Sequence, residues 1–519
     1  MAMATVLSRA QHGMEAPLVR VEVDLGPGLP RFAIVGLAEA VVKESRDRVR
    51  AAITNCKFTW PEGRVTVNLS PADLPKDGGR YDLPIALGIL LASDQLPADS
   101  LRDCEFYGEL SLNGEVQSMQ GVLLAAVAAA RDKHSIFVPR ANVAEAALVT
   151  GCRIAIASSL PDVVAHGNGK APLSFITGAA PESAAGIEAD LCEVRGQEIA
   201  KRALEIAAAG AHSLLFIGPP GTGKSMLAQR LPGLLPQMSE GEALEVASVR
   251  SVARLPIDTS RWRTRPFRTP HHSASSVALV GGGSRPRPGE ISLAHHGVLF
   301  LDELPEYERA ALEVLREPLE TGVITISRAA QQAEFPASFQ FVAAMNPCPC
   351  GYLGDERGIC HCTSEQVRKY RNRLSGPLID RLDLHVEVLR VPHETLRVPD
   401  PHAETTATVS ARVVRVRELQ LARQGCANAR LLTREIERLC NPTARARNLL
   451  DQAANKFCFS ARAYHRVLKV ARTIADLAHV ERIDTAHVSE AMMLRKLDRA
   501  DQPAHRTRVG ITRGDQGER

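Results

Sequence analysis

The segment SLLFIGPPGTGKS, residues 213–225, joins a short apolar run to a glycine-rich turn. The run Leu214 to Ile217 predicts a buried strand, and Ser225 to Leu231 predicts the beginning of a helix. A glycine-rich turn between a strand and a helix is the context that a nucleotide site requires, and this turn satisfies the motif G-x-x-x-x-G-K-[ST]. The segment therefore predicts an α/β phosphate-binding fold rather than an ordinary glycine turn before a helix.

The side chains of this turn predict its ligands. Backbone N–H groups of the turn and the positive end of the helix are expected to bind phosphate. Lys224 would reach the β- and γ-phosphates, and Ser225 would hold Mg²⁺. The predicted nucleotide-binding residues are Gly218, Pro219, Pro220, Gly221, Thr222, Gly223, Lys224 and Ser225. We therefore expect ATP and Mg²⁺ as cofactors.

A second apolar run, Gly297 to Leu304 (GVLFLDEL), ends in two carboxylates. Buried strands often end in a solvated acid, but this run follows a phosphate loop in the same domain. We expect Asp302 to position Mg²⁺ and Glu303 to polarise the attacking water. Such a pair predicts a hydrolase rather than a kinase. A third apolar run, Phe341 to Asn346 (FVAAMN), ends in the polar amide of Asn346.

Composition limits the classes of protein to which the chain can belong. Its 519 residues predict several domains. The net charge of +4 is close to neutral and aromatic residues make up 4%, so a nucleic-acid surface would be a local patch rather than a base-stacking platform. The apolar runs are shorter than a membrane span requires. Because no charged segment followed by an apolar one begins the chain, a cytoplasmic protein is predicted.

Sequence patterns divide the chain into predicted units. Residues 1–166 alternate strand-like and helical runs, which predicts an α+β domain. Residues 167–190, rich in Gly, Ala, Pro and Ser, predict a linker. Residues 191–395 predict a second α/β domain, and 396–500 predict a helical lid because helical patterns occur there without strands. The polar tail 501–519 is predicted to be disordered.

The order of GPPGTGKS, LFLDEL, AAMNP and GPLIDRLDLHVEV resembles AAA+ ATPases of the magnesium-chelatase-like branch, and nearly the whole chain resembles the ComM (YifB) family. The resemblance implies a ring, normally a hexamer, with ATP at the subunit boundaries. It implies that Asn346 orients the water or senses the γ-phosphate. It also implies that Arg381 is an arginine finger supplied in trans and that Arg462 is the second-sensor arginine. The alternative for both arginines is surface salt bridging.

Two segments are expected to project from the ATPase domain. Arg265 to Glu290, rich in Gly, Pro and Arg, predicts a loop where MCM helicases and chelatases carry an insertion. Gly322 to Phe335 predicts a hairpin that resembles the pre-sensor hairpin of MCM, which implies that Arg328 faces DNA in the pore. Arg285 and Arg287 are the other predicted DNA contacts. The alternative is a hairpin that packs on its own domain with Arg328 solvated.

Four of the eleven cysteines lie in the window NPCPCGYLGDERGICHC, within the loop 346–363. Two close pairs of soft ligands can complete a tetrahedral site, and His361 could replace one thiolate. In a reducing compartment, structural zinc is favoured over free thiols or a redox pair. The predicted ligands are Cys348, Cys350, Cys360 and Cys362. Such a site would hold the loop that follows Asn346.

In the first domain, residues 67–91 and 108–126 resemble the proteolytic domain of Lon. Lon proteases place a serine in the stretch that matches Gly79 to Leu83 and a lysine near Leu123, and neither is present in this sequence. Without a nucleophile and its amine base, no peptidase is expected. We therefore interpret this domain as a Lon-protease-like fold that serves assembly or nucleic-acid contact.

The family resemblance implies a DNA-translocating, branch-migration helicase that acts in homologous recombination during natural transformation. The expected partners are further copies of the chain, single-stranded and branched DNA, and the recombinase machinery. One alternative is a magnesium-chelatase-type motor that remodels a protein partner. The other is an ATP-dependent Lon-type protease, against which the missing serine and lysine argue strongly.

Overall fold

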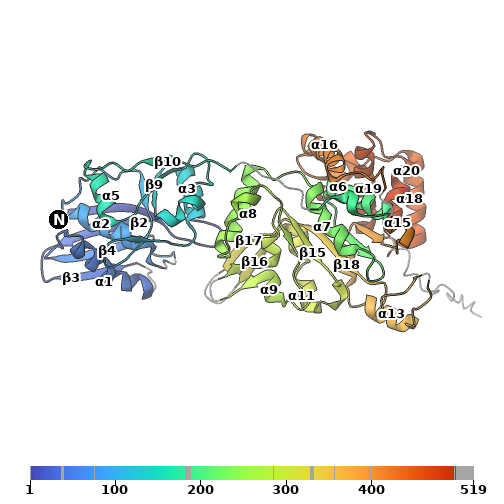
Figure 1. Ribbon diagram of the computed structural model, residues 1–519, viewed down its shortest axis with the longest axis horizontal. Helices are drawn as coiled ribbons and strands as arrows, with labels where there is room; N and C mark the ends of the chain where they lie inside the picture. The colour runs from blue at the N-terminus through green and yellow to red at the C-terminus, as the bar shows by residue number, and fades with distance from the viewer. Residues whose placement is uncertain are drawn as a thin grey trace, which may run out of the picture.

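The computed structural model describes residues 2–36, 40–74, 76, 78–181, 189–283, 286–327, 332–355, 357–397, 400–495 and 497. An N-terminal domain, an ATPase core and a helical domain follow one another along the long axis (Figure 1). The predicted fold class is confirmed, because a parallel core sheet with a helical lid follows a domain that has its own mixed sheet. Within the described ranges, no helix combines the length and apolarity of a membrane span.

The N-terminal domain is built on an eight-stranded sheet with the order β10-β9-β8-β5-β1-β2-β4-β3. In β2, Val19, Val21 and Val23 are fully buried and alternate with more exposed residues, as expected for a sheet with one covered face. The strands are β1 (Ala2–Arg9), β2 (Leu18–Gly26), β3 (Arg31–Val35), β4 (Arg64–Ser70), β5 (Cys104–Phe106), β8 (Ser135–Val138), β9 (Arg153–Ile156) and β10 (Phe175–Thr177). The principal helices are α1 (Ala40–Asn55), α2 (Asp82–Ala92), α3 (Val122–Asp132), α4 (Val143–Ala146) and α5 (Leu160–Gly167).

Strand β10 lies inside the range that the sequence predicted as a linker. It pairs antiparallel with β9, with Phe175 opposite Ala155, so this part of the chain belongs to the N-terminal sheet. The ring of Phe175 meets the ring of Phe137 edge-on at 5.8 Å, and the guanidinium of Arg153 lies 4.8 Å from its centroid. The contacts of Phe175 therefore hold a short strand in a segment whose Gly, Ala and Pro content predicts a linker.

The ATPase core is a five-stranded parallel sheet with the order β12-β15-β18-β11-β19. Every residue of the central strand β11 is buried, in accord with its wholly apolar sequence. The strands are β11 (Leu214–Ile217), β12 (Phe267–Arg268), β15 (Val298–Leu301), β18 (Gln340–Met345) and β19 (Leu384–Glu387). The first helices of the core are α6 (Glu198–Gly210), α7 (Lys224–Leu234) and α8 (Glu240–Val252). Since all five strands are parallel, the turns that follow them meet at one edge of the sheet.

The segment Arg265 to Glu290 is more ordered than the single loop that its composition predicts. Its first residues form β12, where Phe267 stacks on Phe300 at 5.9 Å and Arg268 makes a bidentate pair with Glu290. The rest contains α9 (Ser276–Val280) and a ribbon of β13 (Gly281–Gly282) and β14 (Arg287–Pro288). The insertion therefore begins as an edge strand of the core sheet, because an aromatic contact and an ion pair hold that strand in place.

The predicted hairpin is confirmed as β16 (Val323–Ser327) paired antiparallel with β17 (Gln332–Pro336). Residues 328–331, which include Arg328, lie outside the described residues, as does Arg285. The hairpin contributes Ile326 and Phe335 to a buried cluster that also contains Ala16, from the loop between β1 and β2. The hairpin thus packs on the ATPase core and on the N-terminal domain.

A second contact joins the N-terminal domain to the core. Helix α3 packs against α8, and Ser251 Oγ donates a 2.6 Å hydrogen bond to Glu145 Oε1.

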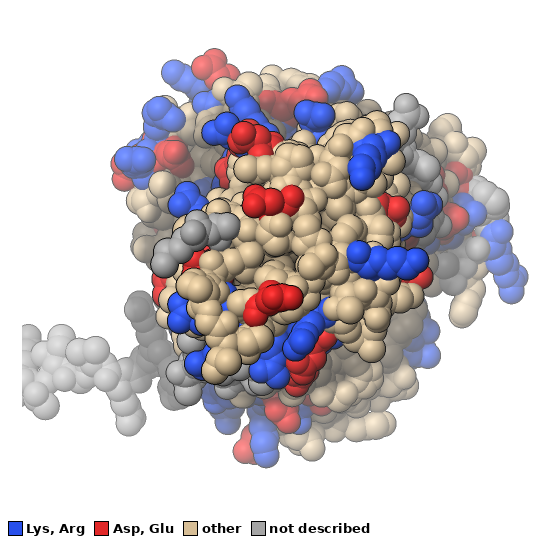
Figure 2. Space-filling view, turned by 90° about the vertical axis from the view of Figure 1, so that its left-hand side faces the viewer, with Lys and Arg blue, Asp and Glu red and all other residues tan. Residues whose placement is uncertain are grey.

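Figure 2 looks onto the far end of the N-terminal domain, where charged side chains of both signs are scattered over a largely uncharged surface. The part of that end which Figure 2 shows therefore presents no continuous basic surface among the described residues.

The helical domain shares one hydrophobic core with the ATPase domain. Leu204 and Phe216 of the ATPase domain lie in the same buried cluster as Leu450 and Val467 of the helical domain. The helices are α16 (Thr406–Gln424), α17 (Thr433–Leu439), α18 (Ala444–Phe457), α19 (Ala461–Leu477) and α20 (Thr485–Met493). Of two shorter helices, α13 (Ser364–Arg371) lies between β18 and β19 in the chain, and α15 (His393–Arg397) follows β19. The lid is thus packed firmly on the core of its own chain.

Candidate active site

The glycine-rich turn follows β11 directly and leads into α7. Gly221 and Gly223 have φ values of +76° and +91°, a region that side chains with a Cβ rarely adopt. A Cβ on Gly218 would lie 2.1 Å from the carbonyl oxygen of Val388, so the backbone can take this path only without a side chain. The glycines thus shape a turn whose N–H groups, together with the N-terminus of α7, can bind phosphate.

Lys224 lies inside this turn, where its ammonium is largely buried. Nζ donates to the carbonyl oxygens of Gly218 at 2.7 Å and Pro219 at 2.9 Å, and to Oδ1 of Asn346 at 3.2 Å. Burial lowers the pKa of Lys224, while Asp302 and Glu303 act in the opposite direction. The predicted lysine, the predicted amide and the two predicted acids are therefore close to one another.

The residues predicted to hold Mg²⁺ are in direct contact. Ser225 Oγ donates a 2.5 Å hydrogen bond to Asp302 Oδ2, and Asp302 Oδ1 accepts a 2.9 Å hydrogen bond from the backbone N–H of Glu303. A hydroxyl and a carboxylate are hard oxygen ligands of the kind that Mg²⁺ selects beside phosphate groups. This donor set fits the expected ion.

Glu303 follows Asp302 in the left-handed conformation, with φ +51°. Its side chain is 52% exposed, and Oε2 lies 3.3 Å from Nδ1 of His272, which belongs to the insertion. Tyr307 Oη donates a 2.6 Å hydrogen bond to the carbonyl of Pro270, which holds the start of the insertion against the turn after Glu303. The proposed water-activating carboxylate thus touches a histidine that no sequence motif indicated.

Arg381 and Arg462 lie near each other, at the edge of the sheet away from their own phosphate loop. Strand β19 pairs in parallel with β11, so Arg381, which precedes β19, lies at the edge where both strands begin. The phosphate loop follows the other end of β11, which is about 10 Å long. Arg381 Nη2 donates a 2.6 Å hydrogen bond to Glu320 Oε1, and Arg462 Nη2 lies 3.5 Å from the same oxygen.

These two arginines differ in exposure. The side chain of Arg381 is 7% exposed and that of Arg462 is 59% exposed, with Glu320 of α12 (Pro318–Thr321) between them. Burial lowers the pKa of Arg381, while Glu320 acts in the opposite direction. Both arginines therefore contact Glu320, and Arg381 lies at the opposite end of β11 from the phosphate loop.

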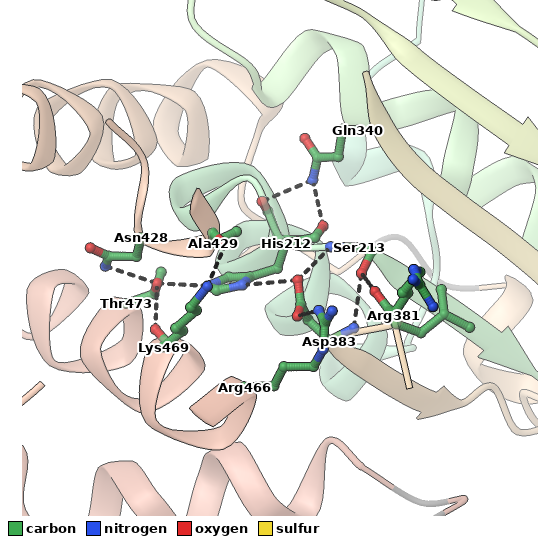
Figure 3. A network of polar contacts seen from close by, with 12 residues as sticks. His212, Ser213, Gln340, Arg381, Asp383, Asn428, Ala429, Arg466, Lys469 and Thr473 are labelled. Atoms are coloured by element: carbon green, nitrogen blue, oxygen red, sulfur yellow. Dashed lines mark hydrogen bonds and ion pairs between the residues drawn. The ribbon is translucent and has the colours of Figure 1, made fainter. Parts of the chain in front are cut away.

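A buried polar network joins the loop of Arg381 to the lid (Figure 3). Asp383 forms an ion pair with Arg466 of α19 and accepts hydrogen bonds from the backbone N–H of Ser213 and from Nδ1 of His212. Burial opposes ionisation of Asp383, but Arg466 and His212 offset it and hold the pKa of this carboxyl well below its usual value. Because His212 Nε2 also contacts Thr473 of α19 at 2.8 Å, the lid and this loop are linked at several points.

The four cysteines form one cluster beside the phosphate loop. Sγ of Cys348 lies 3.4 Å from that of Cys350 and 3.7 Å from that of Cys360. All four Sγ atoms lie within 4.8 Å of one another. His361 is not part of this group. A Cβ on Gly351 would lie 2.8 Å from Cδ of Pro220, so the cysteine loop packs directly on the glycine-rich turn. The arrangement is compatible with Zn²⁺.

A second group, Glu245 with His295 and His296, has ligand-type atoms within 4.8 Å of one another. The backbone N–H of Ser338 donates to Nδ1 of His295 at 3.0 Å, so the ring proton is on Nε2, 3.0 Å from Glu245 Oε2. That nitrogen has no free lone pair for a metal. Burial, and then the neighbouring His296, lower the pKa of His295 to about 4, so it is neutral at pH 7. We interpret this group as a structural hydrogen-bond cluster.

Of the predicted DNA contacts, Arg287 is described and is exposed on β14. Sequence reasoning missed Gln197, whose Nε2 donates to the carbonyl oxygens of Thr222 at 3.2 Å and Leu389 at 2.7 Å. It also missed His272 and Glu320. These residues act through partners distant in the sequence, and no local motif distinguishes them from ordinary surface residues.

Comparison with known proteins shows similarity over almost the entire chain. Family models described as magnesium chelatase subunit ChlI, subunit ChlI of Mg-chelatase and its C-terminal part match residues 190–396, 21–142 and 403–495. Competence protein ComM of Haemophilus influenzae is 51% identical over 96% of this chain and 98% of its own length. Protein YifB of Escherichia coli K12, described as uncharacterized, is 47% identical over the same shares. The magnesium-chelatase 38 kDa subunit of Cereibacter sphaeroides is 27% identical over 29% of this chain and 51% of its own length.

Proposed function

The chain belongs to the ComM (YifB) family of magnesium-chelatase-like AAA+ ATPases, and from this membership we propose that it is a ring-forming motor that drives branch migration of DNA in homologous recombination. The relative named for competence supports a role during uptake of foreign DNA. The chemical part of the proposal depends on the site at the carboxyl edge of the core sheet, and the mechanical part on the two projecting segments.

ATP hydrolysis requires little covalent chemistry from the protein, so positioning and electrostatics dominate. Lys224 would transfer its hydrogen bonds from the loop carbonyls to phosphate oxygens. Ser225 and Asp302 would hold Mg²⁺, which supplies charge neutralisation for the phosphates when it is bound. Glu303 would accept a proton from the attacking water, and Asn346, already hydrogen bonded to Lys224, would orient that water.

The ring proposal is carried by one observation, the separation of Arg381 and Arg462 from Lys224 of the same chain. An arginine stabilises the transition state of phosphoryl transfer only if it touches the transferred group. Arg381 and Arg462 would therefore serve a nucleotide bound by a neighbouring copy, which makes the boundary between copies the complete active site. Arg462 would contact that nucleotide in the same way rather than one in its own chain. A closed ring, in keeping with the hexamer that the family resemblance implies, satisfies this requirement for every copy.

Contact with DNA is proposed for the hairpin β16–β17, through Arg328 from the segment that follows β16 in the sequence, and for the insertion, through Arg285 and Arg287. Support comes from the exposure of Arg287. Arginines in these segments would bind phosphates without reading sequence. The N-terminal domain, which we interpret as Lon-protease-like without peptidase residues, would support the hairpin β16–β17.

The cysteine cluster is proposed to bind a structural Zn²⁺ through Cys348, Cys350, Cys360 and Cys362. Support comes from the convergence of four sulfur atoms and from the chemistry of thiolate ligands. Since Gly351 packs on Pro220, a metal there would fix the wall of the glycine-rich turn as well as the loop after Asn346.

The experiment that tests the proposed function is an ATPase assay with no DNA, single-stranded DNA, blunt duplex and branched DNA. We expect stimulation, and more by single-stranded and branched DNA than by blunt duplex. The alternative is a chelatase-type motor that remodels a protein partner, which the similarity to chelatase subunits favours. If the protein hydrolyses ATP, binds none of these DNA forms and is stimulated by none of them, the result would support that alternative.

A further inference from the structure

We propose that Asp383 is a positioning residue for Arg381, because it fixes the loop that carries this arginine to the first residues of the core sheet and to the lid. This role rests on the proposed function, since the orientation of Arg381 affects hydrolysis only if the arginine serves a nucleotide in a neighbouring copy. The observations behind it are the buried contacts of Asp383 and of the backbone beside it (Figure 3).

The carboxylate of Asp383 is buried and has partners from two parts of the chain. Its side chain is 5% exposed, Oδ1 pairs with Nη1 of Arg466 on α19, and Oδ2 accepts a 3.1 Å hydrogen bond from the backbone N–H of Ser213. His212 Nδ1 lies 3.3 Å from the same Oδ2, and its Nε2 lies 2.8 Å from Thr473 Oγ1 of α19. Separating a buried ion pair leaves an uncompensated charge, so this carboxylate keeps its place between the core and the lid.

The backbone beside Asp383 is held as firmly as its side chain. Ser213 Oγ donates a 2.9 Å hydrogen bond to the carbonyl oxygen of Arg381 and accepts one of 2.9 Å from the backbone N–H of Asp383. Nη1 of Arg495, which lies just after α20, donates to the carbonyl oxygens of Leu382 at 2.9 Å and Asp383 at 3.0 Å. Arg495 is 1% exposed, so these bonds are protected from water. Each residue from Arg381 to Asp383 therefore has a backbone group bound from outside the loop.

The guanidinium of Arg381 depends on that backbone for its position. Nη1 donates a 2.7 Å hydrogen bond to the carbonyl oxygen of Pro377 in α14 (Gly376–Ile379), and Nη2 donates to Glu320. The side chain of Glu320 is 48% exposed, so this pair is not closed off from water. Because a guanidinium binds phosphate and carboxylate oxygens with the same fork of donors, a phosphate of a neighbouring copy can replace Glu320 if the loop holds Arg381 at the right point.

The contacts of Asp383 lie where the lid meets the strand that leads to the phosphate loop. Ser213 directly precedes β11, and the glycine-rich turn begins directly after it at Gly218. Lid helix α16 packs against α7, which begins at Lys224, and lid helix α19 packs against α6. Loss of the Asp383 charge would therefore detach the loop of Arg381 from the lid without removing any group that binds ATP in the same chain.

The alternative is that Asp383 only contributes to the stability of the fold. That role predicts a lower Tm and a loss of activity that no neighbouring copy can repair. A positioning role predicts a defect that follows Arg381. A chain with a displaced Arg381 still binds ATP with its own Lys224, and an intact Arg381 from its neighbour can still serve that ATP. Mixed rings therefore separate the two roles.

The test is the ATPase rate of Asp383→Asn, alone and in rings mixed with Lys224→Ala or Arg381→Ala subunits. Asparagine keeps an acceptor for the N–H of Ser213 but loses the charge that pairs with Arg466. Alone, the variant should lose up to about 10²-fold in kcat, the cost of a small misplacement of a catalytic group, with KM for ATP little changed. Mixing with Lys224→Ala should raise the rate above that of either variant. Mixing with Arg381→Ala should not, because no boundary would then contain an intact arginine loop.

Two further variants complete the test. Asp258→Asn makes the same change at an exposed aspartate and should behave as wild type. Ser213→Ala removes the hydroxyl that binds Arg381 and Asp383 without altering a charge, and it should give the same pattern in mixed rings. If Asp383→Asn does not fold, Ser213→Ala decides the question. Wild-type kcat in the folded variant, or no rescue by Lys224→Ala in rings shown to be mixed, would overturn the role of Asp383.

Failure of the proposed function gives a different result. If wild type does not hydrolyse ATP, or if Arg381→Ala hydrolyses it as fast as wild type, the trans role of Arg381 fails. Hydrogen–deuterium exchange of residues 376–383 then decides the remaining question, because exchange reports local opening without any need for turnover. Faster exchange in Asp383→Asn than in wild type would show that Asp383 holds this loop, and equal exchange would show that it does not.

Discussion

Arg381 donates a 2.6 Å hydrogen bond to Glu320, and Arg462 lies 3.5 Å from the same carboxylate oxygen. The contact lies at the beginning of β11 and β19, whereas Lys224 follows the end of β11. Through Asp383, the loop of Arg381 is also joined to Arg466 on the lid helix α19 that carries Arg462. The two arginines are therefore joined to each other through Glu320, and the loop of Arg381 is joined to the lid through Asp383.

Substitutions of Lys224 and of Glu303 should impair ATP hydrolysis in different ways. Lys224→Ala should lose ATP binding because it removes the ammonium from the turn. Glu303→Gln should bind ATP but turn over on the order of 10²-fold more slowly, since an amide cannot accept the proton of water. ATP binding by equilibrium titration and steady-state hydrolysis separate these effects. Glu306→Gln is the control for a nearby acid, and wild-type turnover from Glu303→Gln would refute the assignment.

Mixing two inactive variants should restore activity if Arg381 acts in trans. In rings that contain both Arg381→Ala and Lys224→Ala subunits, some boundaries combine an intact Lys224 with an intact Arg381. Hydrolysis should therefore exceed that of either variant alone. The control is a mixture of Arg445→Ala, which changes an exposed arginine of α18, with Lys224→Ala. A trans role is ruled out if rings shown to be mixed have no activity above the single variants.

Zinc should copurify at about one ion per chain through the cysteine cluster. Changing Cys348, Cys350, Cys360 and Cys362 to serine should remove it, and should also weaken ATP binding, because the loop packs on Pro220. Metal analysis by mass spectrometry measures the first effect and ATP titration the second. Cys458→Ser, which changes an exposed cysteine outside the cluster, should retain zinc. Unchanged zinc in the four-serine variant means that the ligands lie elsewhere.

Acidification should destabilise the core through His295, whose pKa is lowered from 6.5 to about 4 by burial. Between these values the unfolded chain binds a proton that the folded chain does not, so stability falls as pH falls. At pH 5 the loss is about 2 kcal/mol. His295→Asn, whose amide can accept from Ser338, should show a shallower dependence of Tm between pH 7 and pH 5. An identical slope in wild type and variant would contradict the assignment.

Local sequence patterns were sufficient to predict a strand and its site residues where those residues lie in the turn directly after the strand. The runs Leu214–Ile217, Val298–Leu301 and Phe341–Met345 are apolar and became β11, β15 and most of β18, and each is followed directly by predicted site residues. The same reasoning missed β10, because the contacts of Phe175 with Phe137 and Arg153 are remote in sequence. The partnerships of Arg381 with Glu320 and of Glu303 with His272 are likewise tertiary. A sequence indicates the type of a side chain, but only the fold determines which side chains meet.

The most direct test of the account is movement of a synthetic four-way DNA junction by the purified protein, followed by gel separation of the products. Wild type with ATP and Mg²⁺ should convert the junction to its products, and Glu303→Gln should bind the junction without moving it. Binding should weaken steeply as salt rises and should show little dependence on base sequence. If wild type hydrolyses ATP at full rate but neither binds nor moves any junction, the branch-migration account is wrong.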